Sequence, residues 1–109
     1  MTSSMHYSRN SIVLVPIPFT DLTSSKVRPA VVIGAGSHPD DLFVIPITSQ
    51  LHQTSLRFSD WQTAGLNVPC GLKAQLSTID GRLVRKVVGT LTSTDTAALD
   101  TQLRQWLSL

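Results

Sequence analysis

Apolar residues along this chain occur mostly in short runs that are rich in Val, Ile and Leu and bounded by Gly, Pro, Asn, Asp or Ser. Runs of this kind predict β-strands joined by turns. The predicted strands span residues 11–18, 29–33, 42–49, 55–60, 71–79 and 82–91. After residue 91 the apolar spacing becomes helical. The pattern therefore predicts a mainly β domain closed by one C-terminal helix.

The strand at residues 29–33 is the one around which we expect the sheet to be built. Residues 30–33 are apolar without alternation, which predicts a strand buried on both faces. Proline has no amide donor, so Pro29 is predicted to begin the strand. It favours extended geometry at Arg28 and directs the guanidinium out of the strand end. A fork of donors in that position suits a phosphate, and it equally suits an acid on the protein surface.

Three further prolines and one Asp-Gly pair indicate the shape of the sheet. Pro16 and Pro18 close the first strand, and Pro46 lies inside the third. Because prolines within sheets are confined to edges and bulges, they predict a small, strongly bent sheet such as a compact barrel. Asp80-Gly81 is a strong two-residue turn signal, and it predicts a hairpin between the last two strands.

The helix is predicted to begin after Thr92. Threonine is a favourable N-cap, and Asp95 three residues later resembles the second half of a capping box. One apolar stripe then follows at i, i+4, i+7 and i+8. The stripe consists of Leu99, Leu103, Trp106 and Leu107.

Length, charge and cysteine content favour one soluble domain. At 109 residues the chain has room for a single core, and its net charge of +2 is compatible with a polyanionic partner without requiring one. One cysteine cannot form an internal disulfide, and no apolar run reaches membrane-spanning length, so a cytoplasmic protein is expected. Residues 1–10 are polar and are expected to form a flexible N-terminus before a single domain at residues 11–109.

Metal or nucleophile chemistry has little support in the sequence. His6, His38 and His52 are scattered and Cys70 stands alone, so the spacing of a metal site is absent and no cofactor is expected. A nucleophilic cysteine needs a paired base that the sequence does not identify. We therefore interpret Cys70 as a small buried thiol.

Hydroxyl, amide and ammonium groups offer a second kind of chemistry, that of binding nucleic acid. Thr48 and Ser49 end a buried strand, where their hydroxyls either contact a phosphate or cap the strand end. Lys73 and Gln75 lie on the predicted wet face of residues 71–79, which is either a polar floor for nucleic acid or an ordinary solvated face. Trp61 either stacks on a base or belongs to the core.

A series of short motifs then follows in a fixed order along the chain. They are Pro18-Phe19-Thr20-Asp21, Lys26-x-Arg28-Pro29-Ala30-Val31-Val32-Ile33, Val44-x-Pro46-Ile47-Thr48-Ser49, Asp60-Trp61-x-x-Ala64-Gly65-Leu66, Thr78-Ile79-Asp80 and Val88-Gly89-x-Leu91. This ordered series resembles the MazF/PemK toxins of type II toxin–antitoxin systems. The likeness runs from about residue 11 to residue 109.

The resemblance implies an SH3-like small barrel of the PemK/MazF/CcdB-like toxin fold that works as a homodimer. It also implies a ribosome-independent endoribonuclease that cuts single-stranded RNA at short sequences without a metal and is silenced by a cognate antitoxin. Arg28 matches the family's catalytic arginine, and Thr48 matches its catalytic or phosphate-contacting threonine. Further contacts to RNA are expected from the polar residues beside these positions. They are Lys26, Ser49, Lys73 and Gln75.

Two departures from the family pattern keep other functions open. Some members carry an acidic residue before the arginine, where this chain has 23–25 (Thr-Ser-Ser), and Asp21 is the nearest acid. Members often have arginine and aspartate on the strand that here contains Lys73 and Ala74, so the general base is not identified. The alternatives are a non-enzymatic toxin on the same barrel, like the gyrase-poisoning relatives of this fold, and an RNA-binding barrel without turnover.

Overall fold

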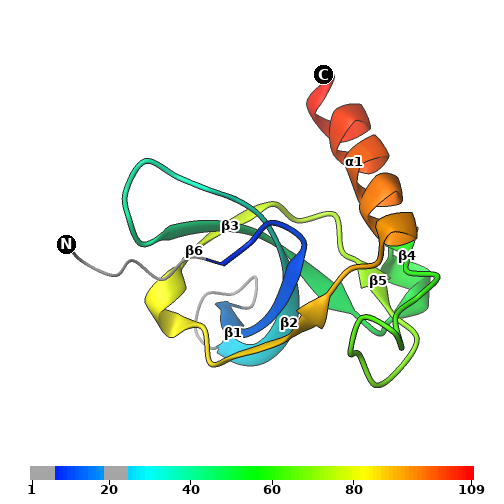
Figure 1. Cartoon of the computed structure of the whole chain (residues 1–109), viewed down its shortest axis with the longest axis horizontal. Coiled ribbons are helices and arrows are strands. Elements are labelled where there is room, and N and C mark those ends of the chain that lie inside the picture. The colour runs from blue at the N-terminus through cyan, green and yellow to red at the C-terminus, as the bar shows by residue number, and fades with distance from the viewer. Residues whose placement is uncertain (1–6, 19–24) are drawn as a thin grey trace.

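The computed structural model describes residues 7–18 and 25–109, and these form an antiparallel half-barrel with one helix at its side (Figure 1). The strands are β1 (Ser11–Pro18), β2 (Ser25–Ala35), β3 (Asp41–Thr48), β4 (Leu56–Arg57), β5 (Gly71–Leu72), β6 (Ser77–Asp80) and β7 (Lys86–Thr90). The helical elements are two 3-10 turns, η1 (Leu51–Gln53) and η2 (Gly81–Leu83), and the helix α1 (Ser93–Leu107). The mainly β class with a C-terminal helix is confirmed.

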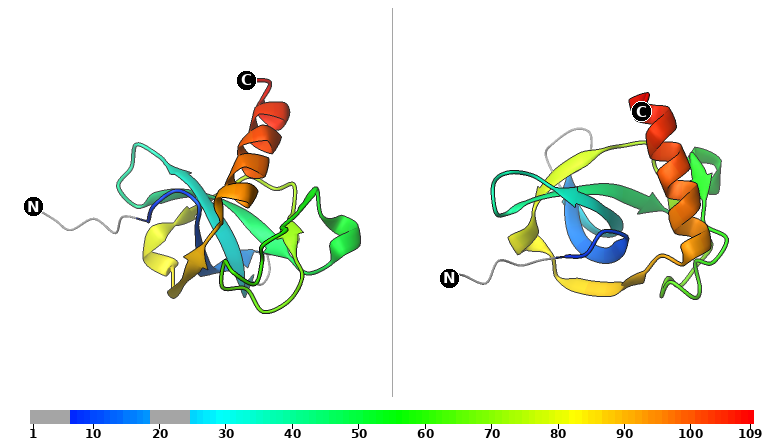
Figure 2. Two further views of the ribbon diagram at one scale, coloured as in Figure 1. Left: turned by 45° about the vertical axis from the view of Figure 1, so that its right-hand side comes forward. Right: turned by 45° about the horizontal axis from the view of Figure 1, so that its top comes forward.

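The central strands β2 and β3 organise the sheet. Its strand order is β4-β5-β3-β2-β1-β7, and β6 pairs with the first half of β3, beside the part that pairs with β5. Register shifts interrupt the β1–β7 ladder after Ile12 and the β2–β3 ladder after Val32. Such irregularities bend and twist a sheet. The bent sheet that the prolines predict is confirmed, and its curve is visible from two further directions (Figure 2).

Two apolar cores cover the two faces of this sheet. In the first core, Val31 of β2 packs with residues from β3, the 58–72 region and α1. In the second, Val32 and Ala30 of β2 pack with residues from β1, β3 and β6. Neighbouring residues of β2 thus belong to different cores, which confirms the prediction of a strand buried on both faces.

The start of β2 differs from the prediction. The strand begins at Ser25, so the prediction that Pro29 begins it is wrong. Residues 25–28 already pair with β1, whereas pairing with β3 begins at Ala30. The proline therefore marks the beginning of the β2–β3 ladder and not the beginning of the strand.

The hairpin predicted at Asp80-Gly81 is also wrong. β6 pairs with β3 and β7 pairs with β1, so the two strands are not partners. The Asp80 carboxylate accepts a hydrogen bond of 2.9 Å from the backbone amide of Arg82 and caps η2. An Asp side chain that bonds its own backbone in this way competes with a two-residue turn.

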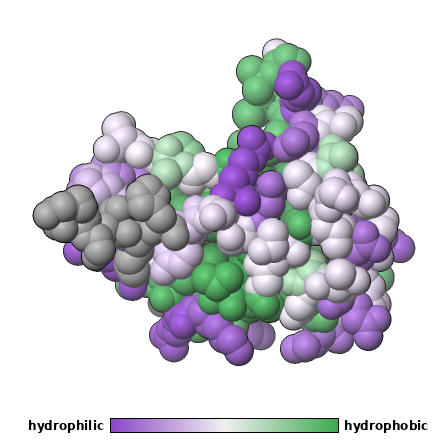
Figure 3. All heavy atoms as spheres, in the orientation of Figure 1, coloured by the Kyte–Doolittle hydropathy of each residue, from purple (hydrophilic) through white to green (hydrophobic). Residues whose placement is uncertain are grey.

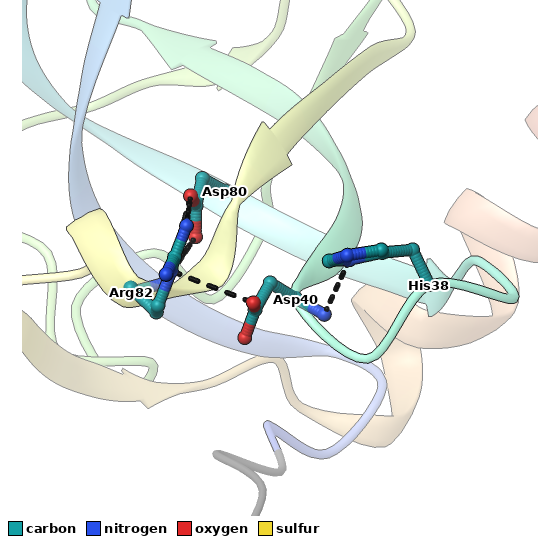
Figure 4. A network of polar contacts seen from close by, with 4 residues as sticks. All are labelled: His38, Asp40, Asp80 and Arg82. Carbon is teal, nitrogen blue, oxygen red and sulfur yellow. Dashed lines mark hydrogen bonds and ion pairs between the residues drawn. The ribbon is translucent and has the colours of Figure 1, made fainter.

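The same arginine ties η2 to the β2–β3 connection (Figure 4). Its guanidinium lies 2.7 Å from the Asp80 carboxylate and 3.5 Å from that of Asp40. The backbone amide of Gly81 donates to the carbonyl of Asp40 at 2.7 Å. Hydrogen bonding from Arg82 lowers the pKa of Asp80 to about 2.

Three predicted strands are shorter than expected. The predicted strand at 82–91 is reduced to β7, because its first residues belong to η2. The predicted strand at 71–79 is interrupted between β5 and β6, because the amide of Gln75 donates to the carbonyl of Lys73 at 2.7 Å and turns the chain. The prediction that Lys73 and Gln75 lie on the wet face of a strand is therefore wrong. The predicted strand at 55–60 is reduced to β4, although Phe58 beyond it is buried.

The helix begins as predicted but caps differently. The Thr92 hydroxyl accepts from the amide of Asp95 at 3.4 Å, which confirms the N-cap. The capping box is wrong, because the Asp95 carboxylate accepts hydrogen bonds from the backbone amides of residues 59 and 60 instead. Of the apolar stripe, Leu99 and Leu103 are buried, whereas Leu107 is 48% exposed. Figure 3 shows apolar surface at the protruding end of α1.

Residues 7–10, the described part of the segment expected to be flexible, contact the domain. Tyr7 packs against the second core, and the Arg9 guanidinium lies 2.7 Å from the Asp100 carboxylate on α1. The domain boundary at residue 11 stays a prediction. Among the described residues, no helix is long and apolar enough to cross a membrane.

Candidate functional site

A pocket of about 420 Å³ opens beside the end of β3, between strands β1, β2 and β7 and the segment at residues 65–70. Its floor follows from the strand register. Leu14 pairs with Pro29 of β2 on one side and with Lys86 of β7 on the other, so the three residues stand in one row on one face of the sheet. Ile47 and Val88 also line the pocket. The floor is therefore largely apolar.

Arg28 lines this pocket from β2 and is half-buried. Arg28 precedes Pro29 on β2 and pairs with Val15 of β1. The β2–β3 ladder begins where Ala30 pairs with Pro46, so Arg28 lies two residues before the ladder on β2 and Thr48 two residues after it on β3. The strand topology thus brings the two predicted catalytic residues to the same end of two neighbouring strands.

Thr48 and Ser49 lie at the end of β3 in different environments. Thr48 is buried, and its hydroxyl accepts a hydrogen bond of 3.0 Å from the backbone amide of Gln50. That bond is the strand-end cap that one interpretation of the sequence predicted. Ser49 is exposed and lines the pocket. Of these two described residues, Ser49 lines the pocket and Thr48 does not.

The other predicted RNA contacts do not line the pocket. Lys26 is exposed and pairs with Ile17 at the start of β2. Lys73 is exposed beside β3, where its backbone amide donates to the carbonyl of Pro46 at 3.0 Å. The side-chain amide of Gln75 donates a hydrogen bond of 3.3 Å to the Ser77 hydroxyl. Asp21, the nearest acid in sequence to Arg28, lies outside the described residues.

The pocket is cationic. Arg28 and Lys86 both line it, and no acidic residue is among the described residues that line it. Within residues 7–18 and 25–109, no carboxylate lies within 4.0 Å of Lys86, whereas Arg9 and Arg82 are occupied by aspartates elsewhere. Sequence reasoning missed Lys86, because only the register of β7 against β1 places it in this row.

One wall of the pocket is the segment 65–68, which lies directly on β7. A Cβ added to Gly65 would lie 2.7 Å from the carbonyl oxygen of Val88, and one added to Gly89 would lie 1.9 Å from that of Ala64. Gly65 also has a φ of +99°, which favours glycine. The two backbones meet in a contact that leaves no room for a side chain at either glycine.

Cys70 contributes a thiol that is chemically inert at neutral pH. It is buried at the edge of the pocket, and its burial, followed by the nearby charge of Asp95, raises its pKa to about 11. A thiol in that state is a poor nucleophile. Trp61 packs against the first core and does not line the pocket, which favours its interpretation as a core residue.

The part of the chain that the structure describes contains no cluster of potential metal ligands. No three His, Cys or Asp side chains come together there. The chemistry available in the pocket is instead that of a guanidinium, an ammonium and a hydroxyl around an apolar floor. This combination suits a phosphate ester that also carries an apolar or aromatic group.

Comparison with known proteins assigns the chain to a family. Residues 8–107 match the family model described as PemK-like, MazF-like toxin of type II toxin-antitoxin system. No curated protein sequence matches the chain. The match covers nearly the whole half-barrel and α1, including every residue that lines the pocket. The chain therefore belongs to the PemK-like, MazF-like toxins of type II toxin–antitoxin systems.

Proposed function

We propose that this toxin is an endoribonuclease that cleaves single-stranded RNA. The observation that carries the proposal is the meeting of Arg28, Ser49 and Lys86 around one pocket with a largely apolar floor. Two cations beside an apolar floor favour a polyanion whose bases stack or bury. Thr48 follows the β2–β3 ladder at the same end as Arg28 and adds a second hydroxyl there.

The proposed reaction is attack by a ribose 2′-hydroxyl on its own 3′-phosphorus. The bond from O2′ to phosphorus forms and the bond from phosphorus to O5′ breaks, which leaves a 2′,3′-cyclic phosphate and a 5′-hydroxyl. One proton leaves O2′ and one arrives at O5′. Arg28 stabilises the negative charge that develops on the phosphoryl oxygens, and no metal takes part in the proposed reaction.

Proton transfer needs a group other than Arg28, since a guanidinium remains protonated in proteins. The described residues that line the pocket include no histidine and no carboxylate. A second group or water must therefore move the protons. Lys86 and Ser49 hold the neighbouring phosphates, and Lys26, Lys73 and Gln75 extend the RNA path beyond the pocket.

Membership in a type II system implies a protein antitoxin as partner. We further propose that the toxin acts as a cytoplasmic homodimer, because a small half-barrel has little core of its own and a second copy extends the RNA groove. Light scattering at micromolar concentration measures the assembly directly. A monomer mass would contradict the dimer.

The test of the nuclease is cleavage of a mixed RNA by the purified chain in the presence of EDTA, with sequencing of the fragment ends. We expect 5′-hydroxyl ends and recurring short cut sequences. Arg28→Ala is expected to reduce the rate on the order of 100-fold or more. Arg28→Lys is expected to be impaired less, because it keeps the charge but not the fork.

Arg57→Ala is the matched control, because Arg57 is an exposed arginine on β4 that does not line the pocket. Thermal melts of all three variants show whether each is folded. A folded Arg28→Ala protein that cuts at the parental rate contradicts the assigned role of Arg28. A folded parent that leaves RNA intact contradicts the nuclease itself.

One observation favours a second function, which is toxicity by binding without cleavage. The described residues that line the pocket include no histidine, aspartate or glutamate that could act as a general base. A toxin that blocks a nucleic-acid enzyme, or one that holds RNA without turnover, needs no such group. RNA that the purified chain retains but does not cut indicates binding without turnover. An inhibition assay with a nucleic-acid enzyme tests whether the chain blocks such an enzyme instead.

A further inference from the structure

Asp95 is a buried carboxylate that the proposed reaction does not use. It lies in the first turn of α1 and is 1% exposed. Its two oxygens accept hydrogen bonds of 2.9 Å each, one from the backbone amide of Ser59 and one from that of Asp60. Charged hydrogen bonds to backbone amides are stronger than neutral ones, so this carboxylate fixes the backbone at 59–60 firmly to the helix.

A reciprocal contact completes this clamp. The Thr92 hydroxyl donates to the Asp60 carboxylate at 2.7 Å while it accepts from the amide of Asp95. A negative side chain in the first turn also interacts favourably with the helix dipole. Two residues at the start of α1 thus hold two residues that lie far away in the sequence.

The clamped residues begin the turn that leads to the pocket. The amide of Ala64 donates to the carbonyl of Asp60 at 3.0 Å, and the amide of Leu66 donates to that of Trp61 at 3.0 Å. The chain then forms the pocket wall at 65–68. The clamp and the wall are therefore the two ends of one short, hydrogen-bonded segment.

We propose that Asp95 is a positioning residue for RNA: by holding the start of the 59–66 turn, it fixes the wall that the RNA contacts in the pocket. This inference rests on the proposed function. Asn67 lines the pocket from this wall. When the turn is displaced, the Asn67 side chain moves with it and RNA binding weakens. The wall then contributes to binding of the substrate and not to the chemical step.

The test is Asp95→Asn, which preserves size but has one acceptor oxygen in place of two. One of the two amides at 59 and 60 loses its partner, and the charge is removed. We expect hydrogen exchange at these amides to become about tenfold faster, in line with the loss of one charge-assisted hydrogen bond. We expect KM for RNA to rise by a similar factor, with kcat nearly unchanged.

Asp100→Asn is the matched control. Asp100 lies on the same helix and loses the same charge, but its partner is Arg9 at the surface. We expect parental KM and parental exchange at 59 and 60 for this variant. A KM as high as that of Asp95→Asn would assign the effect to net charge and overturn the proposal.

A double-mutant cycle with Asn67→Ala separates positioning from simple destabilisation. If Asp95 acts through the wall, its effect on KM shrinks when Asn67 is already truncated. Fully additive effects overturn the proposal, as does a parental KM in an Asp95→Asn protein whose exchange has accelerated. Failure of the proposed function is distinguishable, since in that case the parent itself does not cut RNA.

Discussion

Substitution of Gly89 by alanine tests the close contact between β7 and the pocket wall. The added Cβ would lie 1.9 Å from the carbonyl oxygen of Ala64, whereas ordinary contact begins at 3.4 Å. The two backbones must therefore separate by about 1.5 Å. Both groups are backbone, so no side-chain rotation relieves the overlap.

The expected loss of stability is that of an overpacked interior, about 2 kcal/mol. For a domain of about this size, such a loss lowers the melting temperature by about 8 °C or more. Circular dichroism melts measure it. Because the displaced backbone carries the wall, we also expect a higher KM for RNA in the same variant.

Gly34→Ala provides the control, as a glycine-to-alanine change in another strand of the same sheet. There the added Cβ would meet only the Phe43 ring, at 3.7 Å. Its melting temperature is expected to stay close to the parent or rise slightly, because alanine restricts the unfolded chain. A Gly89→Ala protein that melts like Gly34→Ala would refute the contact, and with it the reasoning on the wall.

Three more outcomes are expected. Cys70 reacts slowly with a disulfide reagent at pH 8 in the native protein and quickly in urea. The fold raises the pKa of Cys70 from 9.0 to about 11. The stability that Cys70 contributes is therefore present below pH 9 and is lost as the pH rises toward 11. Asp80 contributes stability that is present above pH 3.8 and is lost as the pH falls toward 2. Urea titrations that compare Asp80→Asn with the parent measure this contribution. Lys86→Ala weakens binding of a 2′-O-methyl RNA and reduces the salt slope of binding by about 0.7, and an unchanged slope would place Lys86 away from the phosphates.

The features that could be predicted from the sequence are local ones. The bounds of β1 agree with the run of β-branched residues at 11–18, and the N-cap at Thr92 needs only the residues beside it. The two-faced burial of β2 also appears in four consecutive residues. In each case, neighbours in sequence determine the structure.

The features that could not be predicted depend on partners far along the chain. Lys86 enters the pocket through its register with Leu14, and no local pattern carries that information. Asp95 matched a capping box locally, but its carboxylate is used by amides 35 and 36 residues away. At Asp80, the side chain selected a cap for η2 over a hairpin that the dipeptide alone favours.

The clamp between α1 and the 59–60 backbone has a consequence for the order in which the toxin becomes functional during its synthesis. The strands and the pocket floor leave the ribosome before α1, because the helix follows all of them in the sequence. Until α1 has emerged, the first core lacks Leu99 and Leu103, and the amides at 59 and 60 have no carboxylate to hold them. A nascent chain should therefore acquire a fixed pocket wall only when α1 has folded.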